Sequence, residues 1–231
     1  MESKDKGNPF SLTGNQLKII AMAAMFFGHL ALTFDPNNSL VIAFGRTSFP
    51  IFAYMIAEGC KYTRDRKRYF LMLFGLATAC QVVYFLFDGS MYLSILFTFS
   101  LSILTVYALD ALKRSPSPSA ALVFAGTVCA VYALNRFLTV DYGFWGCMVP
   151  VFASLPTDTR YDSPRFRTLA LGLGLLPLAA DLGGIQYYSL LALPLLLLYS
   201  GKRGKHNMKY FFYIFYPVHL AVLQGILFLL A

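Results

Sequence analysis

Residues 51–80 read IFAYMIAEGCKYTRDRKRYFLMLFGLATAC, which is two apolar runs on either side of a segment, Lys61 to Arg68, that holds five Lys and Arg residues. An apolar run of about 20 residues crosses the hydrocarbon core of a bilayer as a helix. Short cytoplasmic loops retain Lys and Arg, whereas short translocated loops carry few. The stretch therefore predicts two membrane-spanning helices joined by a cytoplasmic loop.

The same alternation of apolar runs and basic gaps continues along the chain. Of the 19 Lys and Arg residues, 17 lie in every second gap, whereas the gaps around Asp35, Asp88, Asp141 and Asp181 hold only Arg136. The basic gaps hold Lys4, Lys6 and Lys18; Lys61 to Arg68; Lys113 and Arg114; Arg160, Arg165 and Arg167; and Lys202 to Lys209. We predict an all-α, polytopic bundle of about nine spans, with the N-terminus cytoplasmic and the C-terminus outside. The predicted spans are 17–34, 40–60, 69–87, 91–112, 120–138, 142–155, 169–180, 185–200 and 210–231.

The composition supports a membrane protein. Of the 231 residues, 58% are apolar and 13% are charged, and this balance excludes an ordinary soluble domain. The net charge of +8 would suggest a nucleic-acid partner in a soluble protein. Here it is spread over predicted cytoplasmic loops, where it attracts anionic lipid. We expect no nucleic-acid partner, and one transmembrane domain over 1–231.

The four cysteines lie in or at the edge of apolar runs without Cys-x-x-Cys spacing, so they predict neither a disulfide framework nor a zinc site. No other cluster of metal-ligating residue types is visible, and no metal is expected.

Among the ionisable residues inside predicted spans are His29, Arg46, Glu58 and His219. A charged side chain in hydrocarbon costs about 2.5–3.5 kcal/mol, so residues of this kind usually face a cavity and have a function. At a rise of about 1.5 Å per residue, His29 lies about 8 Å and Arg46 about 9 Å from the outer ends of the first two spans. Side chains at one level on consecutive helices favour a shared polar pocket, and the alternative is an Arg that extends to the interface beside a hydrogen-bonded His. His219 follows Pro217, which frees backbone carbonyls, so both a kink with a satisfied His and a catalytic His remain open. For Glu58, the simplest interpretation is an interfacial salt bridge with the basic run 61–68.

Four blocks in order resemble a known family. They are residues 12–20, leading to His29; Gly45-Arg-Thr-Ser-Phe-Pro50, leading to Glu58; residues 142–146; and residues 211–220, with Tyr-Pro-Val-His at 216–219. Together they resemble the TraX family, the conjugal F-pilin acetylase and its relatives, which is similar in turn to multi-span acyltransferases that use acyl-CoA and carry an essential His in the first helix. By resemblance, His29 takes that role. Family members commonly have Asp-His here, whereas this chain has Gly28-His29, so either another residue orients the imidazole or His29 is a weaker base.

The resemblance implies an acetyltransferase of the bacterial inner membrane. Acetyl-CoA from the cytoplasm would donate to an amine, such as a pilin N-terminus, or to a glycan hydroxyl at the outer side. In this hypothesis His29 is the base, and Arg46, with Tyr216 or His219, stabilises the oxyanion or holds the donor. The residues expected to meet the CoA phosphates are Arg64, Lys67, Arg68, Lys202 and Arg203, although the ordinary bias of cytoplasmic loops explains them equally well.

Two other functions fit the same polar residues. An intramembrane Arg and two His also suit the pathway of a small-molecule transporter. A non-catalytic assembly factor for pili is the third interpretation. Dependence on CoA distinguishes the acyltransferase from both.

Overall fold

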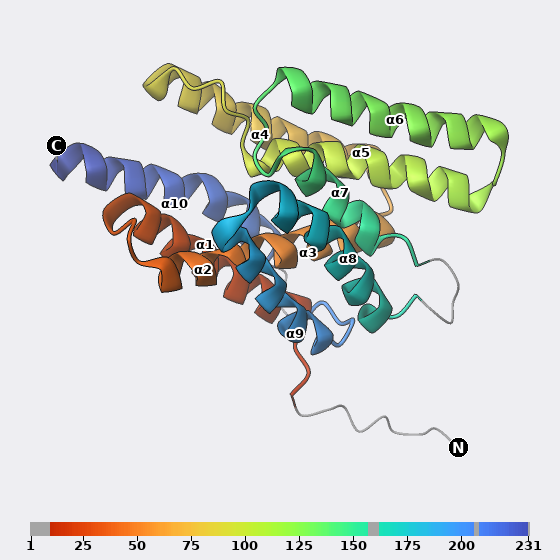
Figure 1. Cartoon of the computed structure of the whole chain (residues 1–231), viewed down its shortest axis with the longest axis horizontal. Coiled ribbons are helices and arrows are strands. Elements are labelled where there is room, and N and C mark those ends of the chain that lie inside the picture. The colour runs from red at the N-terminus through yellow and green to blue at the C-terminus, as the bar shows by residue number, and fades with distance from the viewer. Residues whose placement is uncertain (1–9, 157–161, 206–207, 231) are drawn as a thin grey trace.

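The computed structural model describes residues 10–156, 162–205 and 208–230, and it is a bundle of helices (Figure 1). The helices are α1 (Gly14–Phe34), α2 (Ser39–Arg46), α3 (Ser48–Tyr62), α4 (Arg66–Asp88), α5 (Ile95–Arg114), α6 (Pro118–Phe137), α7 (Gly143–Ala153), α8 (Pro164–Leu182), the 3-10 helix η1 (Gly184–Leu191), α9 (Ala192–Leu197) and α10 (Lys209–Leu230). In these ranges β-type pairing is limited to two isolated bridges, Leu12 with Tyr199 and Leu93 with Val140. The predicted all-α class is confirmed for the described residues.

Five segments among the described residues are long and apolar enough to cross a membrane: Gly14–Phe34, Ser39–Tyr62, Arg66–Leu86, Ile95–Arg114 and Pro118–Phe137. They coincide with the first five predicted spans. Three further apolar helical segments are shorter, Gly143–Ala153, Gly184–Leu197 and Phe211–Ile226. The protein is therefore an all-helical membrane protein, and the count of nine spans stays a prediction.

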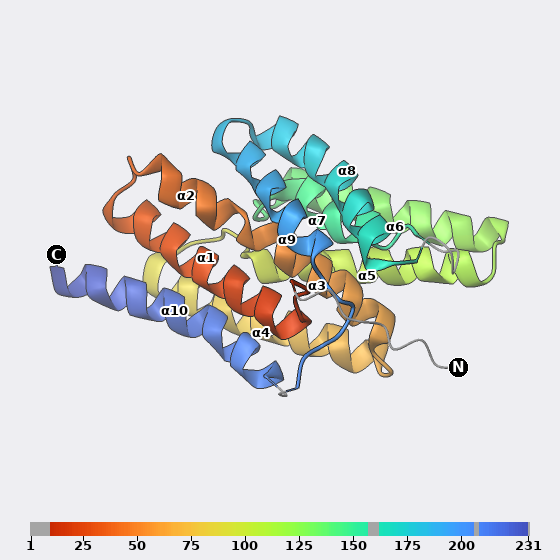
Figure 2. The same ribbon diagram turned by 90° about the horizontal axis from the view of Figure 1, so that it is seen from below.

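Two of the basic loops lie toward one end of the bundle. Both views place the connections α3–α4 and α5–α6 toward the end opposite the C-terminus (Figures 1 and 2). The predicted charge alternation requires this arrangement, while the orientation of the termini in a membrane stays a prediction. Lys4, Lys6 and Arg160 lie outside the described residues.

The second predicted span is present as the segment Ser39–Tyr62, and within it the helix is interrupted at Thr47. α2 ends at Arg46 and α3 begins at Ser48. The ring of a proline clashes with the carbonyl four residues earlier, and Pro50 stands four residues after Arg46. Pro50 itself lies in the first turn of α3, where its missing N–H has no intrahelical partner to lose. At the break, the Thr47 hydroxyl donates to the Phe44 carbonyl at 2.7 Å.

α3 is the central helix of the bundle. In the segment Ser39–Tyr62, 61% of the apolar window is buried, against 6% for Pro118–Phe137 of α6. α3 contacts α1, α5, α7 and α9, and Tyr54 at its middle is fully buried. Side chains of α3 are therefore the ones best placed to line an internal site.

α1 and α2 approach each other most closely at two glycines. A Cβ added to Gly28 would lie 2.7 Å from the Cα of Gly45, and a Cβ on Gly45 would lie 2.6 Å from the Cα of Gly28. Small residues of this kind allow the backbones of membrane helices to meet. The contact holds the next residues, His29 and Arg46, at one level of the bundle, as residue counting predicts.

We expect Gly28→Ala to destabilise the protein, because the added methyl group meets backbone atoms that cannot move alone. The cost should be about 1–3 kcal/mol, and a chain of this size loses about 2–4 °C in Tm for each kcal/mol. Thermal unfolding in detergent measures the effect. Gly126→Ala on α6 is the matched control, since a Cβ there meets nothing within 4 Å, and it should leave Tm unchanged or raise it. An equal response of the two variants would contradict the role of the contact.

Candidate functional site

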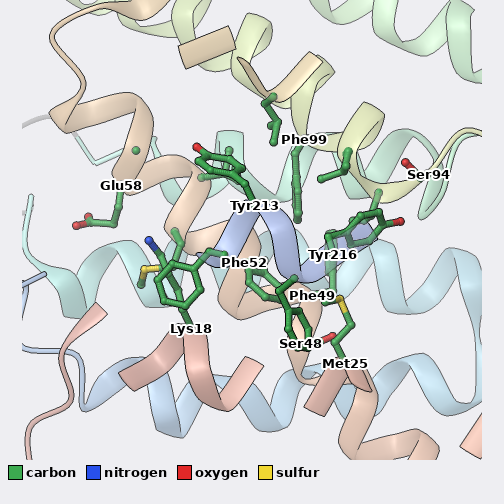
Figure 3. A pocket seen from close by; sticks show the side chains of 18 of the residues that line it. Lys18, Met25, Ser48, Phe49, Phe52, Glu58, Ser94, Phe99, Tyr213 and Tyr216 are labelled. Atoms are coloured by element: carbon green, nitrogen blue, oxygen red, sulfur yellow. The ribbon is translucent and has the colours of Figure 1, made fainter. Parts of the chain in front are cut away.

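A cavity of about 790 Å³ runs between α1, α3, α5 and α10 (Figure 3). Its volume is in the range of sites that hold small molecules, about 300–1,000 Å³. Both Lys18 and His29 line it, and they stand eleven residues apart on α1, so the cavity extends over about 16 Å along that helix. It therefore reaches from the level of the basic loops to the level of His29.

The cavity differs in chemistry along its length. The end near the basic loops is lined by Lys18, Glu58, Tyr62 and Arg203. The middle is aromatic and apolar, with Phe49, Phe52, Met55, Phe99 and Tyr213. The far end is polar again, with His29, Ser94, Asp141 and Tyr216. Figure 3 shows Lys18 and Glu58 at one side of the view and Tyr216 and Ser94 at the other. An extended molecule with a polar group at each end fits this order.

The two histidines of the predicted site meet, although 190 residues separate them. His29 Nδ1 lies 3.0 Å from His219 Nε2, and His219 Nδ1 lies 2.9 Å from the Phe215 carbonyl oxygen. A carbonyl only accepts, so His219 Nδ1 carries the proton, and Nε2 of the neutral ring accepts from His29 Nδ1–H. His29 Nε2 is then the unprotonated nitrogen, which is the form a general base requires.

Position 28 is Gly where the family resemblance leads us to expect Asp, and His219 orients the imidazole of His29 instead. His29 lines the cavity, whereas His219 lies behind it and is 3% exposed. The sequence left open whether a kink or catalysis explains His219. His219 Nδ1 donates to the carbonyl of Phe215, four residues earlier. Pro217 has no N–H to donate to the carbonyl of Tyr213, but His219 does not use that freed carbonyl.

Of the remaining predicted catalytic residues, Tyr216 lines the cavity and Arg46 does not. Tyr216 lines the cavity, with its ring 5.6 Å from that of His219. Arg46 is not one of the described lining residues; its Nε is buried with no hydrogen-bond partner among the described residues, and its side chain reaches Tyr142. Ser94, which the sequence did not single out, is 6% exposed and lines the cavity with an Oγ that has no hydrogen-bond partner among the described residues.

Asp141, in the loop before α7, links Arg46 to the cavity wall. It accepts a hydrogen bond from the Tyr92 hydroxyl at 2.8 Å. Burial raises the pKa of the Asp141 carboxyl, while the hydrogen bond from Tyr92 and the charge of Arg46 lower it. Arg46 does not line the cavity. It therefore acts on this end of the site through the effect of its charge on Asp141 and through its contact with Tyr142.

At the other end, Glu58 forms a buried ion pair with Arg167 of α8. Arg167 is 3% exposed and Glu58 is 8% exposed. Arg167 Nε also donates to the Ala153 carbonyl at 3.1 Å, and the Tyr199 hydroxyl donates to Glu58 at 3.2 Å. The expected interfacial salt bridge of Glu58 with the run 61–68 is therefore wrong. Lys61 and Arg66 of that run pair instead with Asp162 and Asp110, each at 2.7 Å.

Of the five predicted phosphate-binding residues, one lines the cavity. All five are exposed. Of them Arg203 lines the cavity, whereas Arg64, Lys67, Arg68 and Lys202 are not lining residues. Lys18 lines the cavity, with Nζ 4.9 Å from the centre of the Phe212 ring. The sequence assigned Lys18 only to the charge alternation, although its position within the first predicted span, as the second residue of 17–34, was a signal for an inward role.

Comparison with known proteins covers nearly the whole chain. The family model described as TraX protein matches residues 13–227. The "Probable fimbrial assembly protein FimC, serogroup H1" of Dichelobacter nodosus is 28% identical over 242 residues, with 90% of this chain and 93% of that protein covered. No solved structure matches. The matched range includes both histidines, the buried ion pair and every residue named above as lining the cavity.

We expect Arg167→Met to unfold or strongly destabilise the protein, because it leaves the Glu58 carboxylate buried without its partner. Removing one member of a buried pair costs about 3–5 kcal/mol. Thermal unfolding in detergent is the measurement. Glu58→Gln combined with Arg167→Met should recover part of the loss, and Arg165→Met, at an exposed position of the same helical turn, should change stability by less than about 0.5 kcal/mol. Equal stability of Arg167→Met and Arg165→Met would contradict the structural role of the pair.

Proposed function

Because the chain belongs to the TraX family, we propose that it is a membrane-embedded acetyltransferase that takes the acetyl group from cytoplasmic acetyl-CoA and gives it to an acceptor at the outer side of the inner membrane. The observation that carries the proposal is the state of His29. One ring nitrogen is held by His219, and the other is left as a base at the end of a cavity whose opposite end is basic. The orientation of the spans proposed from the charge pattern puts that basic end in the cytoplasm.

The donor would enter from the basic end. Lys18 and Arg203 line the basic end of the cavity and can contact the CoA phosphates. Arg64, Lys67, Arg68 and Lys202 do not line the cavity, so their role would be to attract the anion and not to hold it. The pantetheine arm would pass the aromatic middle of the cavity. This path brings the thioester to the level of His29.

The residues at His29 suit acyl transfer. The acceptor nitrogen or oxygen attacks the thioester carbonyl carbon while its proton passes to His29 Nε2. As the tetrahedral intermediate collapses, the C–S bond breaks and the CoA sulfur takes that proton. The Ser94 Oγ, which is buried without a partner among the described residues, and the Tyr216 hydroxyl are the donors placed to stabilise the oxyanion. Arg46 would add positive charge from behind Asp141 and Tyr142, and no step requires a metal.

The acceptor we propose is a pilus subunit or a similar secreted polypeptide. The relative in Dichelobacter nodosus is named a probable fimbrial assembly protein, and the TraX resemblance implies pilin acetylation. The name of that relative also supports a second candidate, an assembly factor that binds pilus proteins without chemistry. A small-molecule transporter would use the same cavity as a path.

We expect acetyl-CoA to bind the purified protein with micromolar Kd in calorimetry. Replacing Lys18 and Arg203 together by Ala should weaken binding by tenfold or more, since each charge-assisted contact is worth about 1.5–3 kcal/mol and about 1.4 kcal/mol is a factor of ten. Replacing the exposed residues Arg64, Lys67 and Arg68 by Ala should change Kd less than this. Absence of binding to a folded protein would favour the transporter or the assembly factor over the acetyltransferase.

We expect His29→Ala to lower kcat for acetyl transfer by about 10²–10⁴-fold, the usual share of a general base. Residual activity above a tenth of wild type would remove His29 as the base. His219 is a positioning residue, so His219→Leu should lower kcat without weakening acetyl-CoA binding. His219→Gln, whose side-chain oxygen can still accept from His29 Nδ1–H, should recover most of the activity. An equal loss of kcat in the Leu and Gln variants would contradict a role for the hydrogen bond between His219 and His29.

A further inference from the structure

Tyr62, the last residue of α3, presents an exposed aromatic ring at the basic end of the cavity. It is 65% exposed. Three other aromatic residues that line this end are buried or half-buried, namely Tyr69, Tyr199 and Phe212. An aromatic side chain left in water forgoes the stabilisation that burial would give it. In a cavity wall, such a ring offers a flat apolar face to a ligand.

The ring of Tyr62 is held in place by the residue before it. Lys61 Nζ lies 5.1 Å from the centre of the ring, within the range of about 6 Å for a cation–π contact. The same nitrogen lies 2.7 Å from Asp162 Oδ2, so Asp162 keeps the cation over one face of the ring. The exposed area of Tyr62 is left to the other face and the edge. A ring fixed in this way binds a flat ligand without first being ordered.

The position of Tyr62 fits the nucleotide end of the proposed donor. The diphosphate would contact Lys18 and Arg203, and the pantetheine arm would follow the cavity for about 16 Å to His29. The adenosine then stays at the basic end of the cavity, where Tyr62 stands. A nucleobase is flat and has a π-face, and it stacks on aromatic side chains of proteins.

Anchoring at the membrane interface is the alternative explanation for an exposed tyrosine, because Tyr is enriched there. Tyr187 and Tyr188 of η1 fit that explanation, since they are 50% and 49% exposed and are not among the described lining residues. Tyr62 differs from them because it lines the cavity together with Lys18 and Arg203. An aromatic ring beside two cations in one cavity wall suits a ligand that carries both a base and phosphates.

We propose, on the basis of the acetyl-CoA dependence proposed above, that Tyr62 is the platform on which the adenine base of the donor stacks. Tyr62 is then a specificity-determining residue. It favours thioesters of CoA over thioesters of the same phosphopantetheine arm that lack the nucleotide, including an arm attached to a carrier protein. It acts on donor binding alone and takes no part in the transfer of the acetyl group.

The test is calorimetry on the purified protein in lipid nanodiscs with two ligands. One is acetyl-CoA, and the other is acetyl-phosphopantetheine, which keeps the thioester, the arm and one phosphate but has no adenosine. Tyr62→Leu should raise Kd for acetyl-CoA fivefold or more, which is about 1 kcal/mol and the lower end of base–aromatic stacking. It should leave Kd for acetyl-phosphopantetheine within twofold of wild type. Tyr62→Phe keeps the ring and should bind both ligands as wild type does.

Two controls separate stacking from other effects of the substitution. Tyr188→Ala removes an exposed ring that does not line the cavity, and it should leave both Kd values unchanged. Tyr62→Ala should give the same ligand-specific loss as Tyr62→Leu, so the test does not depend on one variant.

The proposal is overturned if Tyr62→Leu binds acetyl-CoA as wild type does, or if it weakens both ligands equally, as a merely structural residue would. An equal loss in Tyr62→Phe and Tyr62→Leu would also overturn it, since the hydroxyl and not the ring would then be responsible. Failure of the proposed function gives a different result, because wild type would then bind neither ligand. That result would overturn the stacking platform together with the acetyl-CoA dependence.

Discussion

The contact between Gly28 and Gly45 is the constraint on which the site depends. It brings the backbones of α1 and α2 together at a separation that no side chain would allow. His29 and Arg46 follow these glycines directly, so their level in the bundle is set by the same contact. The break at Thr47 then turns the chain into the buried helix α3, whose side chains line the cavity. One pair of small residues thus positions both His29 and the wall of the cavity.

The imidazole of His29 is oriented without a formal charge. In many sites a carboxylate holds the catalytic histidine, but an isolated carboxylate at this depth would be costly in hydrocarbon. Here a neutral imidazole and a backbone carbonyl hold it instead, since the Phe215 carbonyl fixes the proton of His219, and His219 fixes that of His29. A side chain at position 28, such as the Asp that the family resemblance leads us to expect, would collide with Gly45.

Sequence reasoning predicted the helices and the level of His29 and Arg46, because hydropathy, charge and helical rise are local properties. It missed contacts that depend on which way a side chain points. Arg167 was counted among loop charges, yet it turns inward to Glu58. The meeting of His29 with His219 joins the first helix to the last, and no spacing rule relates residues 190 positions apart. The break at Thr47 was visible in Pro50, but the apolar run around it favoured one helix.

The buried pair of Glu58 and Arg167 also affects the charge that an anion would meet at the basic end of the cavity. Glu58 lines the cavity at the same end as Lys18 and Arg203, and an unpaired carboxylate there would repel phosphate groups. Arg167 approaches Glu58 from α8, is not one of the described lining residues, and cancels that charge within the protein. The cations that line the cavity at this end are Lys18 and Arg203. The pair thus separates two positions for positive charge, with Arg167 inside the fold against Glu58 and Lys18 and Arg203 on the cavity wall.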